Sequence, residues 1–302
     1  MITPLPFRLG VLDLCKVSSG LGPAESMFAS LKLAQICESV GYSRYWVGEH
    51  HTSDSYSSNP CLLVPLLASV TRSMRVGFGG MIAGYQSPRW MAETAFALSE
   101  LFPKRIDVGV CKGPGVAFRE VSLELARGDE KRLTHEAMRE VCFALNSFFQ
   151  RRLASCALAS DPGPKGVLCP DMWVLGSSIN TARLAEELEA PFALSFLSRG
   201  TNLTNALDEY GSPIRVLAVS IICAETTREA ACIGADIEAL GLLPHNLMGS
   251  PDDCATALRK ISADRGVEEF IVSNWIPSAE ARARSFELLA KAVTTGVPAN
   301  AL

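Results

Sequence analysis

The sequence has no apolar run long enough to cross a bilayer, which takes about 20 residues, and no basic segment followed by a long apolar stretch at its start. The first absence argues against a membrane-spanning helix and the second against an export signal. We therefore expect a soluble protein that stays in the cytoplasm and has no membrane partner.

Basic residues are not in excess either. The chain has 28 lysines and arginines against 32 aspartates and glutamates, a net charge of -4, and its basic residues are scattered. Proteins that bind nucleic acid gather positive charge on one patch to meet the phosphate backbone. We therefore expect no nucleic-acid partner.

Paired cysteine spacing is also missing. Ten cysteines are present, but no two of them form a C-x-x-C pair. Such pairs mark many zinc sites, and a secreted disulfide framework would need an export signal as well. We expect free thiols, most of them acting as small buried apolar residues.

Hydrophobic residues make up 48% of the chain and charged residues 20%, the balance of a globular protein with a large core. Short apolar or β-branched runs alternate with longer segments whose apolar residues recur at helical spacing, which predicts repeated βα units. The predicted strands cover residues 9–14, 45–48, 75–82, 106–111, 172–176, 192–196, 216–223 and 269–273. The predicted helices cover residues 24–40, 61–71, 88–101, 131–149, 179–189, 202–210, 227–240, 252–264 and 279–293.

Eight strands, each followed by a helix, favour a closed (β/α)8 TIM barrel of the α/β class, with an open doubly wound sheet as the alternative. The length also allows two small domains, but we see no linker that divides the chain, and we predict one domain over residues 1–302. Pro162, Gly163, Pro164 and Gly166 predict a surface loop before the fifth strand. In a barrel, functional side chains collect where the strands end, because that rim gathers the loops of all eight units.

Four segments carry a resemblance to a known family: GYSRYWVGEHH, VGFGGMIAGYQSP, PKRIDVGVCKGPG and MWVLGSSINTARLAEEL. In this order and spacing they closely resemble the bacterial luciferase-like, flavin-dependent monooxygenases. The similarity begins at LGVLDL and extends to MGSPDDCATAL and the helix around residues 285–290. It therefore covers most of the chain and implies a luciferase-like barrel.

This resemblance implies a two-component monooxygenase reaction. Reduced FMN, delivered by a separate NAD(P)H:flavin reductase, reacts with O2 to give a C4a-(hydro)peroxyflavin that oxygenates a small organic substrate. The cofactor performs the difficult step, and the protein positions flavin and substrate, excludes water and manages a proton. The resemblance also implies a homodimer, a common oligomeric symmetry.

Two of the four histidines are adjacent, His50 and His51. The resemblance places the pair beside the flavin and substrate pocket, and imidazole suits proton transfer near neutral pH, so we predict a catalytic role for His50 and a pocket position for both. A structural hydrogen bond at the barrel rim is the alternative. Adjacent histidines with Glu49 lack the separated ligands of a metal site, so we expect no metal.

The resemblance also indicates which residues contact the flavin ring and which contact its phosphate. Gly79-Gly80 aligns with a non-proline cis peptide beneath the ring, with a β-bulge or tight turn as the alternative. Cys111 aligns with the reactive cysteine of true luciferases, with a buried inert thiol as the alternative. The residues predicted to contact the phosphate are Lys112, Arg132, Ser177, Ser178 and Asn180. The alternative is that the two cations are solvated surface residues and that the other three residues only cap a helix.

Position along the chain predicts the substrate pocket. Asp13 and Leu14 after the first strand, the 54–59 loop and Trp275 after the eighth strand are expected to line it, and residues 240–251 to form a short lid. Luciferases carry a longer mobile loop there, so the trimmed segment argues against long-chain aldehydes and light emission. It suits a biosynthetic hydroxylation, N-oxidation or Baeyer–Villiger-type oxygen insertion.

Three other functions stay open. The chain could be an F420-dependent oxidoreductase that transfers hydride without O2, or a non-catalytic protein that binds a flavin. It could also be a barrel hydrolase with a metal or a pair of carboxylates. The EHH, CKG and SSxN pattern favours FMN.

Overall fold

The computed structural model describes residues 7–113, 119–154, 161–162, 168–197, 215–241 and 245–295. Its strands follow the order β6-β5-β4-β3-β2-β1-β9-β7-β8, and β6 also pairs with β7. This additional pairing closes eight parallel strands into a (β/α)8 barrel and confirms the predicted fold class. The strands are β1 (Arg8–Asp13), β2 (Arg44–Val47), β3 (Arg75–Ile82), β4 (Ile106–Cys111), β5 (Asp171–Gly176), β6 (Phe192–Ser195), β7 (Val216–Cys223), β8 (Leu247–Gly249) and β9 (Glu269–Ser273).

The ends of the eight barrel strands match those of the eight predicted strands within one residue. Every residue of β7 and of β9 is buried, as expected for parallel strands that are covered on both faces. One further strand, β8, lies outside the barrel, pairs with residues 221–223 of β7 and was not predicted. It corrects the second half of the expected lid, because residues 247–249 form a strand and helix α9 begins at Pro251, whereas residues 242–244 of that lid lie outside the described residues.

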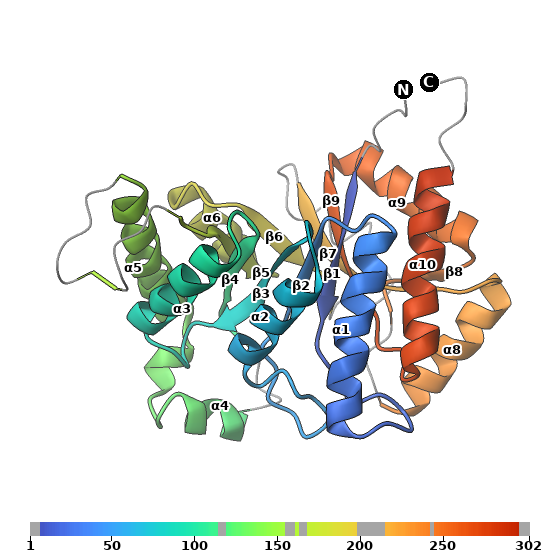
Figure 1. Ribbon diagram of the computed structural model, residues 1–302, viewed down its shortest axis with the longest axis horizontal. Helices are drawn as coiled ribbons and strands as arrows, with labels where there is room; N and C mark the ends of the chain where they lie inside the picture. The colour runs from blue at the N-terminus through green and yellow to red at the C-terminus, as the bar shows by residue number, and fades with distance from the viewer. Residues whose placement is uncertain are drawn as a thin grey trace. The chain divides into compact units, whose positions relative to one another are not determined.

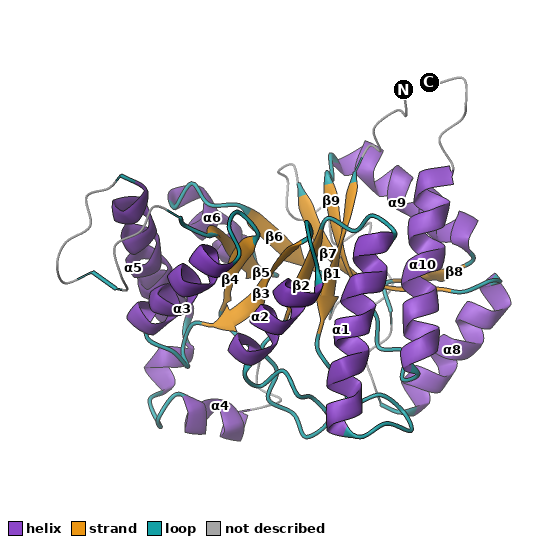
Figure 2. Ribbon diagram, viewed as in Figure 1, coloured by secondary structure: helices purple, strands orange, loops and turns teal. Residues whose placement is uncertain are grey.

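The helices lie along the strands, as Figures 1 and 2 show. They are α1 (Pro23–Ser39), α2 (Pro60–Val70), α3 (Pro88–Leu101), α4 (Arg119–Leu125), the 3-10 helix η2 (Glu130–Leu133), α5 (His135–Leu153), α6 (Ile179–Glu187), α8 (Thr227–Ala239), α9 (Pro251–Arg265) and α10 (Ala279–Thr295). The predicted start of α5 at residue 131 was wrong, because the Thr134 side chain caps the helix by accepting from the Ala137 N–H. The predicted helix 202–210 and residues 163–166 of the predicted loop lie outside the described residues.

The chain divides into two compact units. Unit 1 comprises Met1–Tyr45, Asp54–Tyr56 and Ala193–Leu302, and unit 2 comprises Trp46–Ser53 and Ser57–Phe192. In unit 1, α10 packs against α1 and α9. In unit 2, α3 packs against α5, where the Phe96 and Phe149 ring centroids are 5.4 Å apart.

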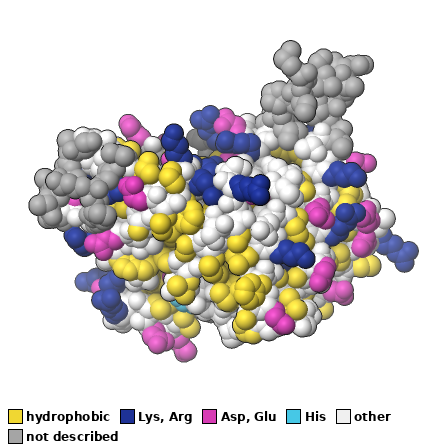
Figure 3. All heavy atoms as spheres, in the orientation of Figure 1, with side chains coloured by type: hydrophobic (Ala, Val, Ile, Leu, Met, Phe, Trp, Pro, Cys, Tyr) yellow, Lys and Arg dark blue, Asp and Glu magenta, His cyan; other side chains and the backbone are white. Residues whose placement is uncertain are grey.

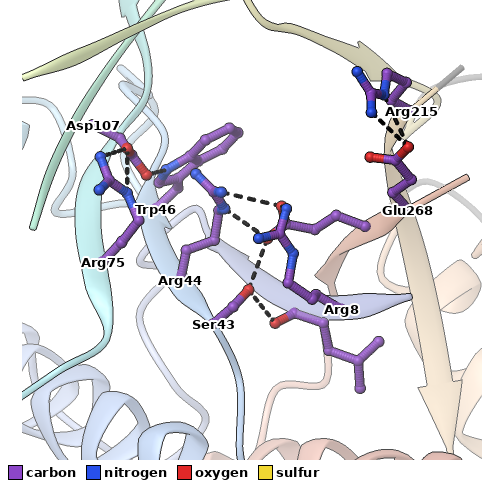
Figure 4. A network of polar contacts seen from close by, with 10 residues as sticks. Arg8, Ser43, Arg44, Trp46, Arg75, Asp107, Arg215 and Glu268 are labelled. Atoms are coloured by element: carbon purple, nitrogen blue, oxygen red, sulfur yellow. Dashed lines mark hydrogen bonds and ion pairs between the residues drawn. The ribbon is translucent and has the colours of Figure 1, made fainter. Parts of the chain in front are cut away.

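Buried carboxylates hold the amino ends of the strands together in each unit (Figure 4). In unit 1, the fully buried Glu269 carboxylate accepts from Arg44 Nε at 2.6 Å, from Ser43 Oγ at 2.7 Å and from Arg8 Nη2 at 3.2 Å. In unit 2, the Asp107 carboxylate accepts from Trp46 Nε1 and Arg75 Nε, both at 2.9 Å. The amino ends of barrel strands serve stability, so these charges belong to the scaffold.

Candidate active site

In unit 2, the loop after β2 is fastened to the end of β3 by Glu49. Its nearly buried carboxylate accepts from the Ile82 backbone N–H at 2.7 Å, and its other oxygen lies 2.9 Å from His51 Nε2. The Glu49 backbone N–H donates to the Gly80 carbonyl at 3.3 Å. The His51 ring packs edge-on against Tyr85, with centroids 5.4 Å apart. These contacts fix His51 and therefore the short segment that also carries His50.

The Gly79-Gly80 peptide bond is cis, as the resemblance to the family implied. The β3–β4 register shifts between Phe78 and Met81, so the ladder is also irregular here, which was the alternative reading. A Cβ on Gly80 would lie 2.9 Å from the Gly109 carbonyl oxygen, closer than side-chain carbons are found. Only glycine fits this position, and the backbone stays bare at the end of β3.

Cys111 ends β4, with its sulfur held as a neutral thiol. Burial, reinforced by the Glu49 charge, raises its pKa to about 12, and the backbone N–H groups of Gly113 and Gly80 oppose this only in part. Thiolate is the reactive form of cysteine. The surroundings therefore favour the protonated thiol near neutral pH, and the role of Cys111 beside the flavin stays a prediction.

Cys111 is expected to resist alkylation. A pKa of about 12 in place of 9.0 lowers the thiolate population at pH 8 roughly a thousandfold. Iodoacetamide at pH 8 should therefore modify the exposed Cys232 long before Cys111, as measured by peptide mass spectrometry over time. Equal rates at the two cysteines would contradict this account.

The predicted phosphate contacts follow the carboxyl ends of two neighbouring strands, β4 and β5, which pair in parallel. Lys112 is exposed directly after β4. Arg132 lies in η2, and its Nε donates to the Gly84 carbonyl after β3 at 2.8 Å. Ser178 caps α6 by accepting from the Thr181 N–H, so its hydroxyl acts as the N-cap named as the alternative, whereas Asn180 is exposed and Ser177 partly exposed.

A separate cavity of ≈ 210 Å³ lies in unit 1. The predicted residues Asp13, Leu14, Asp54 and Trp275 all line it, together with Asn274. His50 and His51 line a much smaller hollow in unit 2, beside Glu49, Ile82 and Tyr85. The structure thus gathers the predicted substrate residues into two groups, one in each unit.

The Asp13 carboxylate is an anchor of the unit 1 cavity wall. It accepts from Ser30 Oγ and Tyr45 Oη, both at 2.6 Å, and from the Cys15 backbone N–H at 2.8 Å, and Arg282 Nη1 lies 4.0 Å away. Burial, and then the Asp13 charge, raise the pKa of Tyr45, which keeps that hydroxyl protonated as a donor. The carboxylate is therefore a fixed, already compensated charge.

His245, which sequence reasoning missed, supports the Trp275 wall. Its Nε2 accepts from the Trp275 backbone N–H at 3.1 Å, and its ring packs on that indole with centroids 4.8 Å apart. The imidazole is buried, and burial lowers its pKa to about 4. It is therefore neutral near pH 7 and carries its proton on Nδ1, which has no partner among the described residues.

His245 makes the fold sensitive to mild acid. Its pKa is about 4 in the folded chain against an ordinary 6.5, so unfolding takes up a proton between these values, and stability falls as the pH drops from 6.5 to 4. The expected loss is about 3 kcal/mol. Urea unfolding of the wild type and of His245→Gln across this range measures it. Equal pH slopes for the two proteins would rule out this role of His245.

Sequence reasoning also missed Asn274, Glu49 as a positioning group, and Tyr85. Asn274 could have been found because it directly precedes Trp275 after a predicted strand. Glu49 could have been found because it belongs to the EHH motif. Within the described ranges, no His, Cys, Asp or Glu cluster could hold a metal ion, and no helix is long and apolar enough to cross a bilayer.

Residues 7–232 match the family model described as luciferase-like monooxygenase. The chain belongs to the luciferase-like monooxygenase family. Membership makes this luciferase-like monooxygenase an oxidoreductase by class. It is 28% identical to the N-acetyl-S-alkylcysteine monooxygenase of Bacillus subtilis. The alignment is 331 positions long and covers 95% of this chain and 98% of the relative.

Solved structures share the fold of this luciferase-like monooxygenase. Apo-MsnO8 superposes with a TM-score of 0.82 at 26% identity, covering 95% of this chain and 98% of that one. The FMN complex of the oxygenating constituent of 3,6-diketocamphane monooxygenase from Pseudomonas putida gives 0.71 at 20% identity, covering 96% and 99%. An F420-dependent secondary alcohol dehydrogenase gives 0.63 at 13%, covering 95% and 99%. The last two likenesses show the fold alone.

Proposed function

We propose that this luciferase-like monooxygenase is the oxygenating component of a two-component system. It takes reduced FMN from a separate NAD(P)H:flavin reductase and uses O2 to oxygenate a small organic substrate in the cytoplasm. The carrying observation is the glycine end of β3, which holds the Glu49 and His51 pair, together with the cationic and hydroxyl groups that follow β4 and β5. The similarity over 95% of this chain to the N-acetyl-S-alkylcysteine monooxygenase of Bacillus subtilis supports oxygenation over hydride transfer with F420.

The residues of unit 2 fit a flavin. Gly79 and Gly80 carry no side chains, so the end of β3 offers bare backbone for the close approach of a flat ring. Lys112 and Arg132 supply positive charge for the phosphate. Within the described part of the chain, Arg132 makes its hydrogen bond through Nε alone, which leaves both terminal nitrogens for an anion. Ser177 and Asn180, at the start of α6, add neutral donors.

The histidines would manage the proton of the reaction. Reduced FMN, when bound, supplies two electrons and activates O2. His50 is assigned to hold and transfer a proton, because an imidazole changes charge near neutral pH. Glu49 keeps His51 in one orientation through its 2.9 Å contact, so His51 orients the segment and contacts the substrate.

We also propose a homodimer. Helices α2 and α3 of unit 2 carry exposed apolar side chains, and Figure 3 shows such side chains gathered over these helices. They include Leu62 at 62% exposure and Leu101 at 69%. Packing of these helices against a second copy of the chain would remove their apolar side chains from water. Light scattering of the purified protein tests the proposal, because a homodimer has twice the mass of one chain.

Flavin titration of Arg132→Ala tests the phosphate site. Loss of the guanidinium should weaken FMN binding about 10- to 100-fold, because charge-assisted hydrogen bonds to phosphate are strong, and should leave riboflavin binding unchanged, because riboflavin has no phosphate. The matched control is Arg119→Ala, which removes an exposed arginine paired with Glu130. Equal losses for FMN and riboflavin, or none for FMN, would contradict the assignment.

A further inference from the structure

The cavity of unit 1 is lined by a guanidinium that the fold uses only in part. Arg282, in the first turn of α10, donates from Nε to the Ile276 carbonyl at 3.1 Å and from Nη2 to Ser18 Oγ at 3.0 Å. Its Nη1 lies 4.0 Å from the Asp13 carboxylate, too far for a hydrogen bond, and has no acceptor among the described residues. This nitrogen is not one of the unpartnered side-chain atoms that burial closes off from solvent. Its N–H groups are therefore open to a ligand in the cavity.

A second cation, Lys16, lines the same cavity from the loop after β1. Its side chain is 19% exposed, and its ammonium is paired with the Asp54 carboxylate. An ammonium carries three donors, so this one contact leaves the others for further acceptors. The backbone beside the pair is also fixed, because the Val17 N–H donates to the Asp54 carbonyl at 2.8 Å. The ammonium is therefore held at the cavity with donors to spare.

The acceptors of the cavity wall, in contrast, are occupied. The Asp13 carboxylate accepts from the hydroxyls of Ser30 and Tyr45 and from a backbone N–H. The Asp54 carboxylate accepts from the ammonium. The two cations and two carboxylates of the wall balance in formal charge, so the selectivity comes from the unused charged donors. Such donors bind an ionised acceptor most strongly, and a guanidinium matches a carboxylate in shape.

The rest of the wall is apolar, and the cavity is small. Leu14, Val17, Leu240, Trp275 and Pro277 contribute to the wall, and the cavity measures ≈ 210 Å³. Leu240 is 65% exposed, so the cavity opens to solvent. An apolar cavity of about 150 Å³ is known to hold benzene, so this one suits a ligand of roughly eight to ten non-hydrogen atoms.

We propose that this cavity binds a small organic acid, with the carboxylate held by Arg282 Nη1 and Lys16 Nζ and the apolar body against Trp275. The ligand's carboxylate oxygens accept from the two cations, which Asp13 and Asp54 hold in position. That this acid is the substrate of oxygenation rests on the proposed function, whereas its binding does not.

Four ligands test the proposal by calorimetry on the full chain without flavin: benzoate, benzamide, benzamidinium and acetate. Benzoate should bind with a Kd on the order of 1 mM or tighter. It should bind about tenfold tighter than benzamide, which has the same shape but no charge, and than acetate, which lacks the apolar body. Benzamidinium, which offers only donors, should bind most weakly.

Substitutions of the paired residues separate recognition from a structural role. Lys16→Met should lower the affinity for benzoate about tenfold and change that for benzamide by less than about threefold. Asp54→Asn should raise the affinity for benzoate about threefold, because it removes the carboxylate that competes for the ammonium. A purely structural ion pair would give losses in both variants. The matched control, Lys260→Met, removes an exposed lysine paired with Asp264 and should leave both affinities unchanged.

Arg282→Gln should also lower the affinity for benzoate about tenfold. Should this variant not fold, the ligand ranking on the wild type and the opposite effects of Lys16→Met and Asp54→Asn still decide. Benzamide or benzamidinium binding as tightly as benzoate, no saturable binding of benzoate, or full affinity in Lys16→Met would each overturn the proposal. None of these results depends on flavin, so a failure of oxygen activation is recorded separately.

Discussion

Glu269→Ala is expected to lower the free energy of unfolding by about 3–5 kcal/mol. The substitution leaves the Arg44 guanidinium, 5% exposed, without the carboxylate that receives its Nε at 2.6 Å and its Nη2 at 3.1 Å. Ser43 loses its 2.7 Å partner as well. Domains are stable by only about 5–15 kcal/mol, so urea unfolding should show a large shift of the midpoint.

The adjacent glutamate is a matched control for Glu269. Glu268 pairs with Arg215 at 2.7 Å, but its side chain is 52% exposed and that of Arg215 is 70% exposed. Glu268→Ala should therefore cost less than about 1 kcal/mol. In the double variant Arg44→Met with Glu269→Leu, most of the loss should return, because no buried charge is left unpaired. Equal effects of the two alanine substitutions would refute the scaffold role of Glu269.

His50→Gln is expected to lower the turnover number by about 10²- to 10⁴-fold, the range that general acid–base catalysis contributes. Glutamine keeps a polar side chain of similar length but cannot change its charge between pH 5 and 8. The dissociation constant for FMN should change by less than about threefold, because the proposed phosphate and ring contacts come from other residues. Steady-state oxygenation with a saturating reductase measures the first quantity, and flavin titration the second.

Glu49→Gln provides the comparison for His50→Gln. It keeps the size of the side chain at the Ile82 N–H but weakens the charged contact with His51. We expect a smaller loss of turnover than for His50→Gln and a change in the pH profile. A turnover number of His50→Gln within about threefold of the wild type would remove His50 from the chemistry.

Sequence patterns were sufficient for the barrel because its strands are buried on both faces. The eight apolar runs, such as residues 216–223, carry a strong signal. The three residues of β8 are too few for any periodicity, so they were mistaken for part of a lid. The start of α5 was misplaced because a single capping hydroxyl, Thr134, outweighed the helical pattern around it. The single domain over residues 1–302 stays a prediction.

One feature of the site was predictable from the resemblance to the family. The resemblance implied a cis bond between Gly79 and Gly80, and the structure shows it. The role of His245 depends on what packing leaves without a partner, which no linear pattern reveals. The same is true of Cys111, whose thiol is kept neutral by burial and by Glu49, 62 positions away in the chain. The roles predicted for the site residues toward flavin and substrate stay predictions.

The central claim is that unit 2 binds reduced FMN and controls its reaction with O2. Stopped-flow mixing of the anaerobic protein and reduced FMN with oxygenated buffer tests it most directly. We predict a long-lived transient that absorbs near roughly 370–380 nm before oxidised flavin forms, slower than the reaction of free flavin. Immediate oxidation at the rate of free flavin, with no transient, would contradict the account and leave hydride transfer from F420 or flavin carriage as the functions to test.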